Sequence, residues 1–214
     1  MGHSSFLSKL LQHSKSGILS DTEMIHILGG SSDQRYGLVK RAISQGTLLH
    51  LRRGLYAISA LFRRQPYHLF EIASHLYSPS YISFESALSY HGWIPEAVPI
   101  VTSATPRRKS EFDTVLGIFR YLHVPQVDAF SCVSRIEAEN NAVFFMASPW
   151  KAIVDYVYTF KKNWHGLGPL THGLRIEPDK WEPPSQIDLA SLYKQYKSVR
   201  VHHFLDGIQR EFSL

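Results

Sequence analysis

The sequence predicts an α+β protein in two parts, a smaller one over residues 1–63 and a larger one over residues 66–214. Three observations lead to this prediction. The first part reads as helices followed by a hairpin, helical and strand-like patterns then alternate to the end, and the charge changes at the same boundary. With 214 residues, of which 44% are hydrophobic, the chain can bury a core of ordinary size.

Positive charge is concentrated in the first part. Residues 1–65 hold 9 Lys/Arg against 3 Asp/Glu, a net charge of +6, whereas residues 66–214 hold 14 against 15, a net charge of −1. A basic segment beside a neutral one is typical of a nucleic-acid-binding module joined to a domain with another task. A solvated basic surface would give the same count, so the charge has to be weighed together with the predicted elements.

The first two predicted helices carry start and stop signals. In "SFLSKLLQHS" four apolar residues share one helical face, namely Phe6, Leu7, Leu10 and Leu11. The second helix begins with a capping box, Ser20-x-x-Glu23, in which Leu19 and Met24 form a hydrophobic staple. Gly29-Gly30 ends this helix with a sharp turn.

A third helix is predicted in "SSDQRYGLVKRAISQG", with Ser31-x-x-Gln34 as a second capping box and Gly46 as the stop. Its apolar residues should point inward, namely Tyr36, Leu38, Val39, Ala42 and Ile43. Its polar residues should point outward, namely Gln34, Arg35, Lys40 and Arg41.

The hairpin "GTLLHLRRGLYAIS", residues 46–59, alternates apolar and polar positions and breaks at Arg52-Arg53-Gly54. Leu49, Leu51 and Leu55, with Ile58, should anchor the ribbon to the core. The two arginines at the tip are placed to clasp a phosphate or to reach into a minor groove. They would also serve simply to keep an edge ribbon soluble.

The order helix, helix, tight turn, helix, hairpin is typical of a winged helix-turn-helix, which predicts binding to double-stranded DNA. Ser32 lies where a helix N-terminus meets a phosphate. Gln34 can pair with adenine and Arg35 with guanine, whereas Lys40 and Arg41 are better placed for the DNA backbone. The predicted DNA-binding residues are therefore Ser32, Gln34, Arg35, Lys40, Arg41, Arg52 and Arg53. Winged helices also bind proteins, and that alternative stays open.

The larger part reads as a mixed α+β domain after a linker around residues 61–67. We expect a helix near 68–77, a strand at "YIS", a helix capped by Ser83, strands at "PIVTSAT" and "GIFRYLHV", a strand leading into a helix at Ser148-Pro149, and two C-terminal helices. The glycine-rich "HGLGPLTHG" is expected to form a loop.

Motifs for catalysis and metal binding are not found. The sequence has no H-E-x-x-H, no paired-cysteine zinc pattern and no phosphate loop, so we expect no catalytic residue, no metal site and no cofactor. The histidines are interpreted as scattered, and Ser83 as a helix cap instead of a nucleophile. Cys132 is expected to be a small buried residue. The basic turn "PRRKS", residues 106–110, is interpreted as solvated, with DNA or an acidic partner as the alternative.

No run of 18 apolar residues and no signal-peptide pattern is present, so a cytoplasmic protein without a membrane partner is expected.

Three stretches carry a resemblance to a known family: "HLRRGLYAIS", "YISFESALSYHGWIPEAVPIVTSATPRRKSEF" and "IFRYLHV". They resemble the AbiEi family of type IV antitoxins, which are transcriptional regulators of abortive-infection systems. The segment "SPWKAIVDYVY" also looks like the helix opening that follows in such proteins. The resemblance covers residues 5 to about 160 and extends only loosely over the C-terminal helices. Trp93 departs from it, because a smaller aliphatic residue is more usual after "HG".

The resemblance implies an N-terminal winged helix-turn-helix followed by an α+β antitoxin-type domain, and no enzymatic activity. It implies that the winged helix represses the protein's own operon by binding repeats in promoter DNA. It implies that the larger domain counteracts a nucleotidyltransferase-type toxin, directly or indirectly. The reader helix would be Ser32 to Ser44 and the wing Arg52 to Tyr56.

Two other functions stay open on the residues alone. One is a protein-binding adaptor without sequence-specific DNA binding, and the other is a metal-dependent nuclease, for which no carboxylate cluster is evident. A dimer or a cooperative pair of monomers would suit repeated half-sites, and the sequence does not decide between monomer and homodimer.

Overall fold

The computed structural model describes residues 3–95, 98–125, 128, 130–138 and 141–214. The first part consists of α1 (His3–His13), β1 (Ile18–Ser20), α2 (Asp21–Leu28), α3 (Ser32–Ser44), β2 (Leu48–Arg52) and β3 (Leu55–Ile58). It is followed by a short 3₁₀ helix, η1 (Ala60–Phe62). The predicted helices and hairpin are therefore present, and the α+β class is confirmed.

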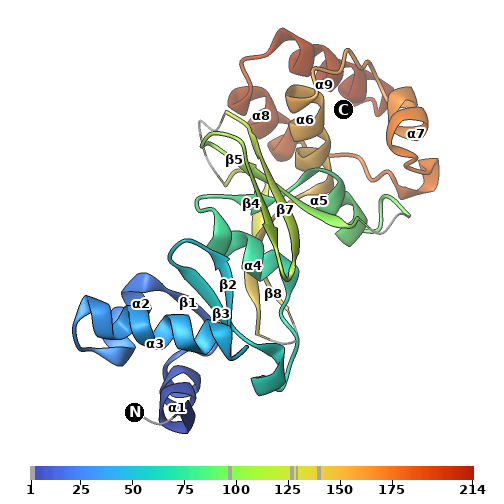
Figure 1. Cartoon of the computed structure of the whole chain (residues 1–214). Helices are drawn as coiled ribbons and strands as arrows, with labels where there is room; N and C mark the ends of the chain where they lie inside the picture. Colours follow the sequence, from blue (N-terminus) through green and yellow to red (C-terminus); the bar gives the residue numbers. More distant parts are fainter. Residues whose placement is uncertain (1–2, 96–97, 126–127, 129, 139–140) are drawn as a thin grey trace.

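The larger part contains a second set of helices and strands. They are α4 (Leu69–Leu76), β4 (Tyr81–Ile82), α5 (Phe84–Tyr90), β5 (Ile100–Thr105), β6 (Ser110–Thr114), β7 (Gly117–His123), β8 (Val133–Glu137), β9 (Val143–Ala147), α6 (Pro149–Thr159), α7 (Gly168–Leu174), η2 (Pro178–Lys180), α8 (Gln186–Gln195) and α9 (Val199–Glu211). Figure 1 shows α1–α3 at one end of the molecule, α6–α9 at the other, and strands of both sheets between them.

Local hydrogen bonds set both ends of α2 and the start of α3. The Glu23 backbone N–H donates to the Ser20 hydroxyl at 3.3 Å, and the Glu23 carboxylate accepts from the Ser20 N–H at 2.7 Å. Ser31 and Gln34 repeat this capping box at the start of α3. Gly29, with φ 61°, ends α2 in a conformation that other residues rarely adopt. Both capping boxes were predicted and are confirmed.

A third strand joins the hairpin, which the sequence analysis did not predict. Strand β1 pairs antiparallel with β3, with Ile18 opposite Ala57, so the sheet order is β1-β3-β2. Three residues are too few to show an alternating pattern, and β1 is a strand because β3 offers it a free edge.

The two faces of this small sheet belong to two different cores. One face packs on α1–α3 in a core of Phe6, Leu10, Leu19, Met24, Val39, Ala42, Leu48 and Ile58. The other face joins the large core of the second part through Ile18, Leu51, Leu55 and Ala57. Two residues expected inside are exposed, Tyr36 at 68% and Leu11 at 45%.

The predicted linker is fastened to the first part. The Tyr67 hydroxyl lies 2.9 Å from the carbonyl oxygens of both Gly17 and Ile58. The Arg63 guanidinium lies over the Tyr67 ring at 3.9 Å and donates to the Ser16 carbonyl. Residues 63–67 therefore hold the end of β3 against the start of β1 instead of acting as a free connection.

The Tyr67 contacts predict a loss of stability at alkaline pH. Burial raises the pKa of Tyr67 to about 12. The unfolded chain then loses its phenolic proton near the ordinary pKa of about 10. The folded chain keeps that proton up to pH 12, so the free energy of unfolding should fall between these values. Urea titrations at pH 9, 10 and 11 should show this decline, and Tyr67→Phe should make it shallower. An equal decline in the variant would mean that Tyr67 contributes nothing to it.

The larger sheet has the strand order β6-β7-β5-β4-β9-β8. Strands β5 and β7 run parallel, as do β4 and β9, whereas the other neighbours are antiparallel. Helix α4 contacts β5 and β9, α5 lies against β5 and α6, and α9 packs on α6.

The edge strands β6 and β8 were not predicted, because "SEFDT" and "VSRIE" carry the charges that protect sheet edges. The segment 168–174 was expected to be a loop and forms α7.

A fully buried ion pair joins two residues of α6 that stand four positions apart. The Lys151 ammonium contacts the Asp155 carboxylate at 2.8 Å, and both side chains have no exposed surface. The hydroxyls of Ser83 and Tyr81 donate to the same carboxylate at 2.6 and 3.0 Å, and the Tyr196 hydroxyl bonds to both charged groups. Ser83 occupies the predicted N-cap position of α5, but its hydroxyl makes no capping hydrogen bond because it donates to Asp155 instead.

The pKa values of this buried network shift in the direction that burial dictates. Burial lowers the pKa of Lys151, and the neighbouring Asp155 carboxylate opposes that effect. Burial raises the pKa of Tyr196, and Asp155 adds to the increase. Both shifts favour the neutral forms, so the protonated lysine depends on its single carboxylate partner.

Candidate nucleic-acid interface

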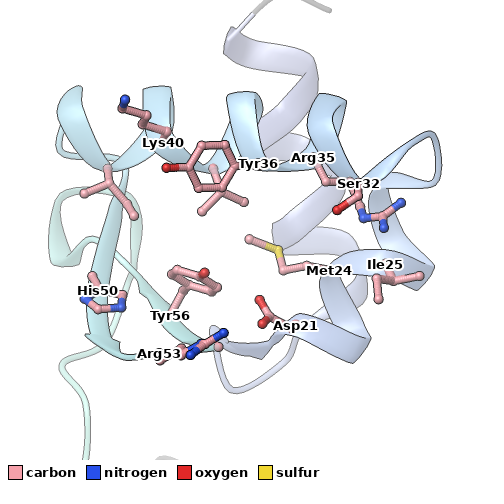
Figure 2. Close-up of a pocket in the computed structure, with 13 residues that line it drawn as sticks. Asp21, Met24, Ile25, Ser32, Arg35, Tyr36, Lys40, His50, Arg53 and Tyr56 are labelled. Atoms are coloured by element: carbon pink, nitrogen blue, oxygen red, sulfur yellow. The ribbon is translucent and has the colours of Figure 1, made fainter.

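A groove of about 860 Å³ lies between α2 and α3 on one side and the β2–β3 hairpin on the other. Its lining residues are Asp21, Met24, Ile25, Ser32, Arg35, Tyr36, Val39, Lys40, Ile43, His50, Arg53, Gly54 and Tyr56. Figure 2 shows Tyr36 on α3 and Tyr56 on β3 pointing into this space from opposite sides, with Asp21 and Arg53 along the wall away from α3.

Four of the seven residues predicted to bind DNA line this groove, and three do not. The four are Ser32, Arg35, Lys40 and Arg53. The three that lie elsewhere are Gln34, Arg41 and Arg52. Folding therefore brings residues from α3 and from the hairpin tip to one surface.

Three of the four α3 residues predicted to point outward are exposed, namely Gln34, Lys40 and Arg41, and Arg35 is half-buried. Tyr36 is also exposed, against the prediction. Ser32, Tyr36 and Lys40 are four residues apart and exposed, so they form one stripe along the helix. The Gln34 side-chain oxygen is used by its capping box at 3.1 Å. The Arg35 guanidinium donates to the carbonyls of Gly29 and Gly30, which holds it against the turn before α3. Tyr36 is thus the residue that the sequence analysis placed wrongly, because its aromatic ring suggested the core.

The Arg41 side chain lies outside the groove. Its Nε donates to the Gly37 carbonyl at 3.2 Å, one turn back along α3. This bond directs the guanidinium along the helix surface, on a face that does not meet the hairpin.

The hairpin tip is packed against the start of α2. The Asp21 backbone N–H donates to the Gly54 carbonyl at 3.0 Å. Gly54 has φ 74°, and a Cβ there would come within 2.8 Å of the Asp21 carboxylate. Glycine is therefore required on two grounds, its backbone conformation and the close approach of Asp21. The tip turns sharply enough to leave Arg53 exposed on the groove side.

The two arginines at the tip have different roles in the fold. The Arg52 Nε donates to the Leu76 carbonyl at the end of α4, at 2.7 Å, and its terminal nitrogen donates to the Arg53 carbonyl at 3.0 Å. Arg52 is only partly exposed and fastens the hairpin to the larger part. Within the part of the chain that the structure describes, the Arg53 guanidinium has no hydrogen-bond or ion-pair partner, and it is exposed.

The basic turn at 106–109 lies close to the hairpin. Arg107 lines a second concavity, of about 420 Å³, together with Arg52, Arg53, His75, Leu76, Tyr77, Ser78 and Phe112. The Arg107 guanidinium donates to the Ser78 carbonyl at 2.8 Å and lies 5.1 Å from the centre of the Tyr77 ring. The predicted solvated turn is therefore partly anchored, and it continues the positive surface of the hairpin tip.

The groove contains a carboxylate and apolar surface besides its cations. Burial raises the pKa of Tyr56, and the facing Asp21 carboxylate raises it further. Tyr36 is 68% exposed and Ile25 47% exposed. The groove can thus offer hydrogen bonds to phosphates through Ser32, Lys40 and Arg53, while its floor offers aromatic and aliphatic contact.

Other candidate chemistry is scarce in the described residues. No three His, Cys, Asp or Glu side chains among them are grouped so as to hold a metal ion. Cys132 was expected to be buried, but it is only half-buried, and its sulfur lies 3.5 Å from the Asp188 carboxylate. Burial and this carboxylate raise the pKa of Cys132 to about 11, so the thiol stays protonated and poorly nucleophilic. No helix within these residues has both the length and the apolar character to cross a bilayer.

Neither a comparison with models of protein families nor a search of curated proteins found a match for this chain.

Proposed function

We propose that the protein is a sequence-specific repressor that binds double-stranded promoter DNA through a winged helix-turn-helix formed by residues 1–63. The proposal extends to a second role for the larger part, as the antitoxin of a nucleotidyltransferase-type toxin. The groove between α3 and the β2–β3 hairpin is the observation that carries the DNA-binding role. It combines a helix with an exposed polar stripe, a neighbouring hairpin with a free arginine at its tip, and the basic excess of the chain.

In this proposal α3 enters the major groove and the hairpin lies along the adjacent backbone. Ser32, Tyr36 and Lys40 face the duplex, with Ser32 at the helix N-terminus where a phosphate is favoured. Tyr36 can contact a base edge or a thymine methyl group with its ring and donate to a phosphate with its hydroxyl. Arg53 supplies the wing contact, and Arg52 holds the wing in place through Leu76.

Fluorescence anisotropy tests the DNA-binding role. The purified protein is titrated with a duplex from upstream of its own gene and with a shuffled duplex, at two salt concentrations. Tight binding that favours the native duplex and weakens with salt is expected, because phosphate contacts release counterions. Equal and weak binding to both duplexes would contradict the proposal. The basic first part would then be a surface without sequence preference.

Asp21 gives a prediction with an unexpected direction. Asp21→Asn should strengthen DNA binding several-fold, because the carboxylate lies in the groove and repels phosphates. The asparagine keeps the size of the side chain and remains compatible with the helix start. Anisotropy with the native duplex measures the change, and Asp33→Asn is the control, since Asp33 is exposed on α3 but does not line the groove. Weaker binding by Asp21→Asn alone would show instead that the carboxylate accepts a hydrogen bond from a base.

One observation favours a different occupant for the groove, namely the exposure of Ile25 and Tyr36. Exposed apolar side chains beside charges also suit a protein partner, which is the adaptor function considered above. The salt dependence separates the two functions. DNA binding should lose affinity with a slope of about −0.9 per phosphate contact on logarithmic axes, and an apolar protein interface should not.

The antitoxin role rests on the resemblance to the AbiEi family. It predicts that co-production of this protein restores growth to cells that make a nucleotidyltransferase-type toxin encoded next to it. The rescue should persist in a variant that no longer binds DNA, because repression and neutralisation are assigned to different parts of the chain. If a variant that folds but no longer binds DNA also failed to restore growth, the protein would act only by repression.

A further inference from the structure

A second basic cavity lies on the larger part and shares no lining residue with the groove. Its volume is about 380 Å³, which lies within the range of small-molecule sites. It is lined by Lys109, Leu122, His123, Tyr158, Thr159, Lys161 and Arg200. These residues come from the β5–β6 turn, the end of β7, the end of α6 and the first turn of α9.

Four nitrogen-bearing side chains converge on this cavity from four separate elements, and no carboxylate lines it. They are Lys109, His123, Lys161 and Arg200. Among the described residues none of the four forms an ion pair. The hydrogen bonds of two of them hold the cavity's shape, since the Arg200 Nε donates to Asn163 at 3.0 Å and the His123 Nδ1 donates to the Arg107 carbonyl at 3.0 Å. Lys109, Lys161 and Arg200 carry positive charge, and cations gathered around one concavity create a positive potential that attracts anions.

Thr159 supplies an independent sign of a ligand. Its hydroxyl oxygen is buried and has no hydrogen-bond partner among the described residues, and the residue lines the cavity. Buried polar atoms are nearly always satisfied, and a helical threonine ordinarily bonds to the carbonyl four residues earlier. A rotation of the side chain about χ1 would bring this hydroxyl to the cavity, where a ligand oxygen can accept the hydrogen bond that the protein does not.

We propose that this cavity binds the polyphosphate group of a small molecule of the nucleoside triphosphate class. A group with several negative charges fits the four converging side chains better than a single phosphate does. The Thr159 hydroxyl donates to one phosphate oxygen, and Leu122 and Tyr158 form an apolar wall for the organic part of the ligand. The site is independent of the DNA-binding role, because no residue of the groove takes part in it.

Isothermal titration calorimetry with inorganic tripolyphosphate tests the site on the full chain at fixed ionic strength. The expected result is one tripolyphosphate per chain, with an affinity at least tenfold above that for orthophosphate. Lys161→Ala with Arg200→Ala should reduce this affinity about tenfold or more, the effect of losing one or more charge-assisted contacts. The matched control is Lys194→Ala with Lys197→Ala, which removes the same charge from exposed positions outside the cavity. Equal losses in both double variants would overturn the proposal, since binding would then follow net charge alone.

Thr159→Val distinguishes a ligand contact from a structural defect. Valine has the same shape without the hydroxyl, so the melting temperature without ligand should stay equal or rise, while the tripolyphosphate affinity should fall several-fold. An unchanged affinity would overturn the assignment of Thr159. A loss of duplex DNA binding in Lys161→Ala with Arg200→Ala, with tripolyphosphate binding unchanged, would overturn the small-molecule site in favour of a DNA backbone contact.

Discussion

Replacing Asp155 with alanine is expected to lower the free energy of unfolding by about 3–5 kcal/mol. The change leaves the Lys151 ammonium fully buried without its carboxylate, which lies 2.8 Å away in the native chain. It also deprives the hydroxyls of Tyr81 and Ser83 of their acceptor. Urea denaturation followed by tryptophan fluorescence measures the loss, because the chain has 4 tryptophans.

The matched control removes both charges at once. Lys151→Met with Asp155→Leu replaces the ion pair by apolar side chains of similar size, which is often neutral or even stabilising. We therefore expect the double variant to be more stable than Asp155→Ala. If Asp155→Ala lost less than about 1 kcal/mol, the buried pair would not be a charged pair, and the lysine would be neutral in the native chain.

Replacing Lys40 and Arg53 together with alanine is expected to reduce affinity for the native duplex about 100-fold, or about 2.7 kcal/mol. Lys40 lies on α3 and Arg53 on the hairpin tip, so the variant removes one cation from each side of the groove. A plot of the logarithm of the binding constant against the logarithm of the salt concentration should become less steep by about 1.8, the value for two phosphate contacts. Anisotropy at four salt concentrations measures both quantities.

A control with the same change in net charge is Lys15→Ala with Arg41→Ala. Both residues are exposed in the basic first part and neither lines the groove. We expect little loss of affinity, which would separate a defined interface from a general positive field. Similar losses in the two double variants would exclude the groove as the binding surface. Arg52→Ala should instead lower the stability of the fold, because the Arg52 side chain donates a hydrogen bond to the Leu76 carbonyl.

The sequence predicted the features that local chemistry decides. Both capping boxes and the glycine turn depend on residues within a few positions of each other, and each is present as expected. Tyr36 was placed wrongly, because it faces the groove and is 68% exposed instead of joining the core. Arg52 lies at the hairpin tip as predicted, but its hydrogen bond to the Leu76 carbonyl depends on the distant α4 and was not foreseen.

The buried network of the larger part was missed although the sequence held a signal for it. Lys151 and Asp155 stand four residues apart inside the apolar run of α6, where an unpaired charge would be costly. Their partners Tyr81 and Tyr196 come from distant segments, so only the fold brings them together. The basic cavity could not be recognised from the sequence for the same reason, since the four nitrogen-bearing residues that line it are spread over positions 109 to 200.

The small sheet that contributes to two cores has a consequence for how copies of the chain would sit on DNA. A fragment ending before residue 66 would expose the apolar face of Ile18, Leu51, Leu55 and Ala57. The first part is therefore not expected to be stable as an isolated domain. In the proposed complex the larger part would therefore project from the duplex in one direction. On repeated sites, that direction turns with the double helix, which completes a turn in about 10.5 base pairs. Inserting half a turn between two repeats would carry neighbouring copies to opposite sides of the duplex, whereas a full turn would return them to the same side.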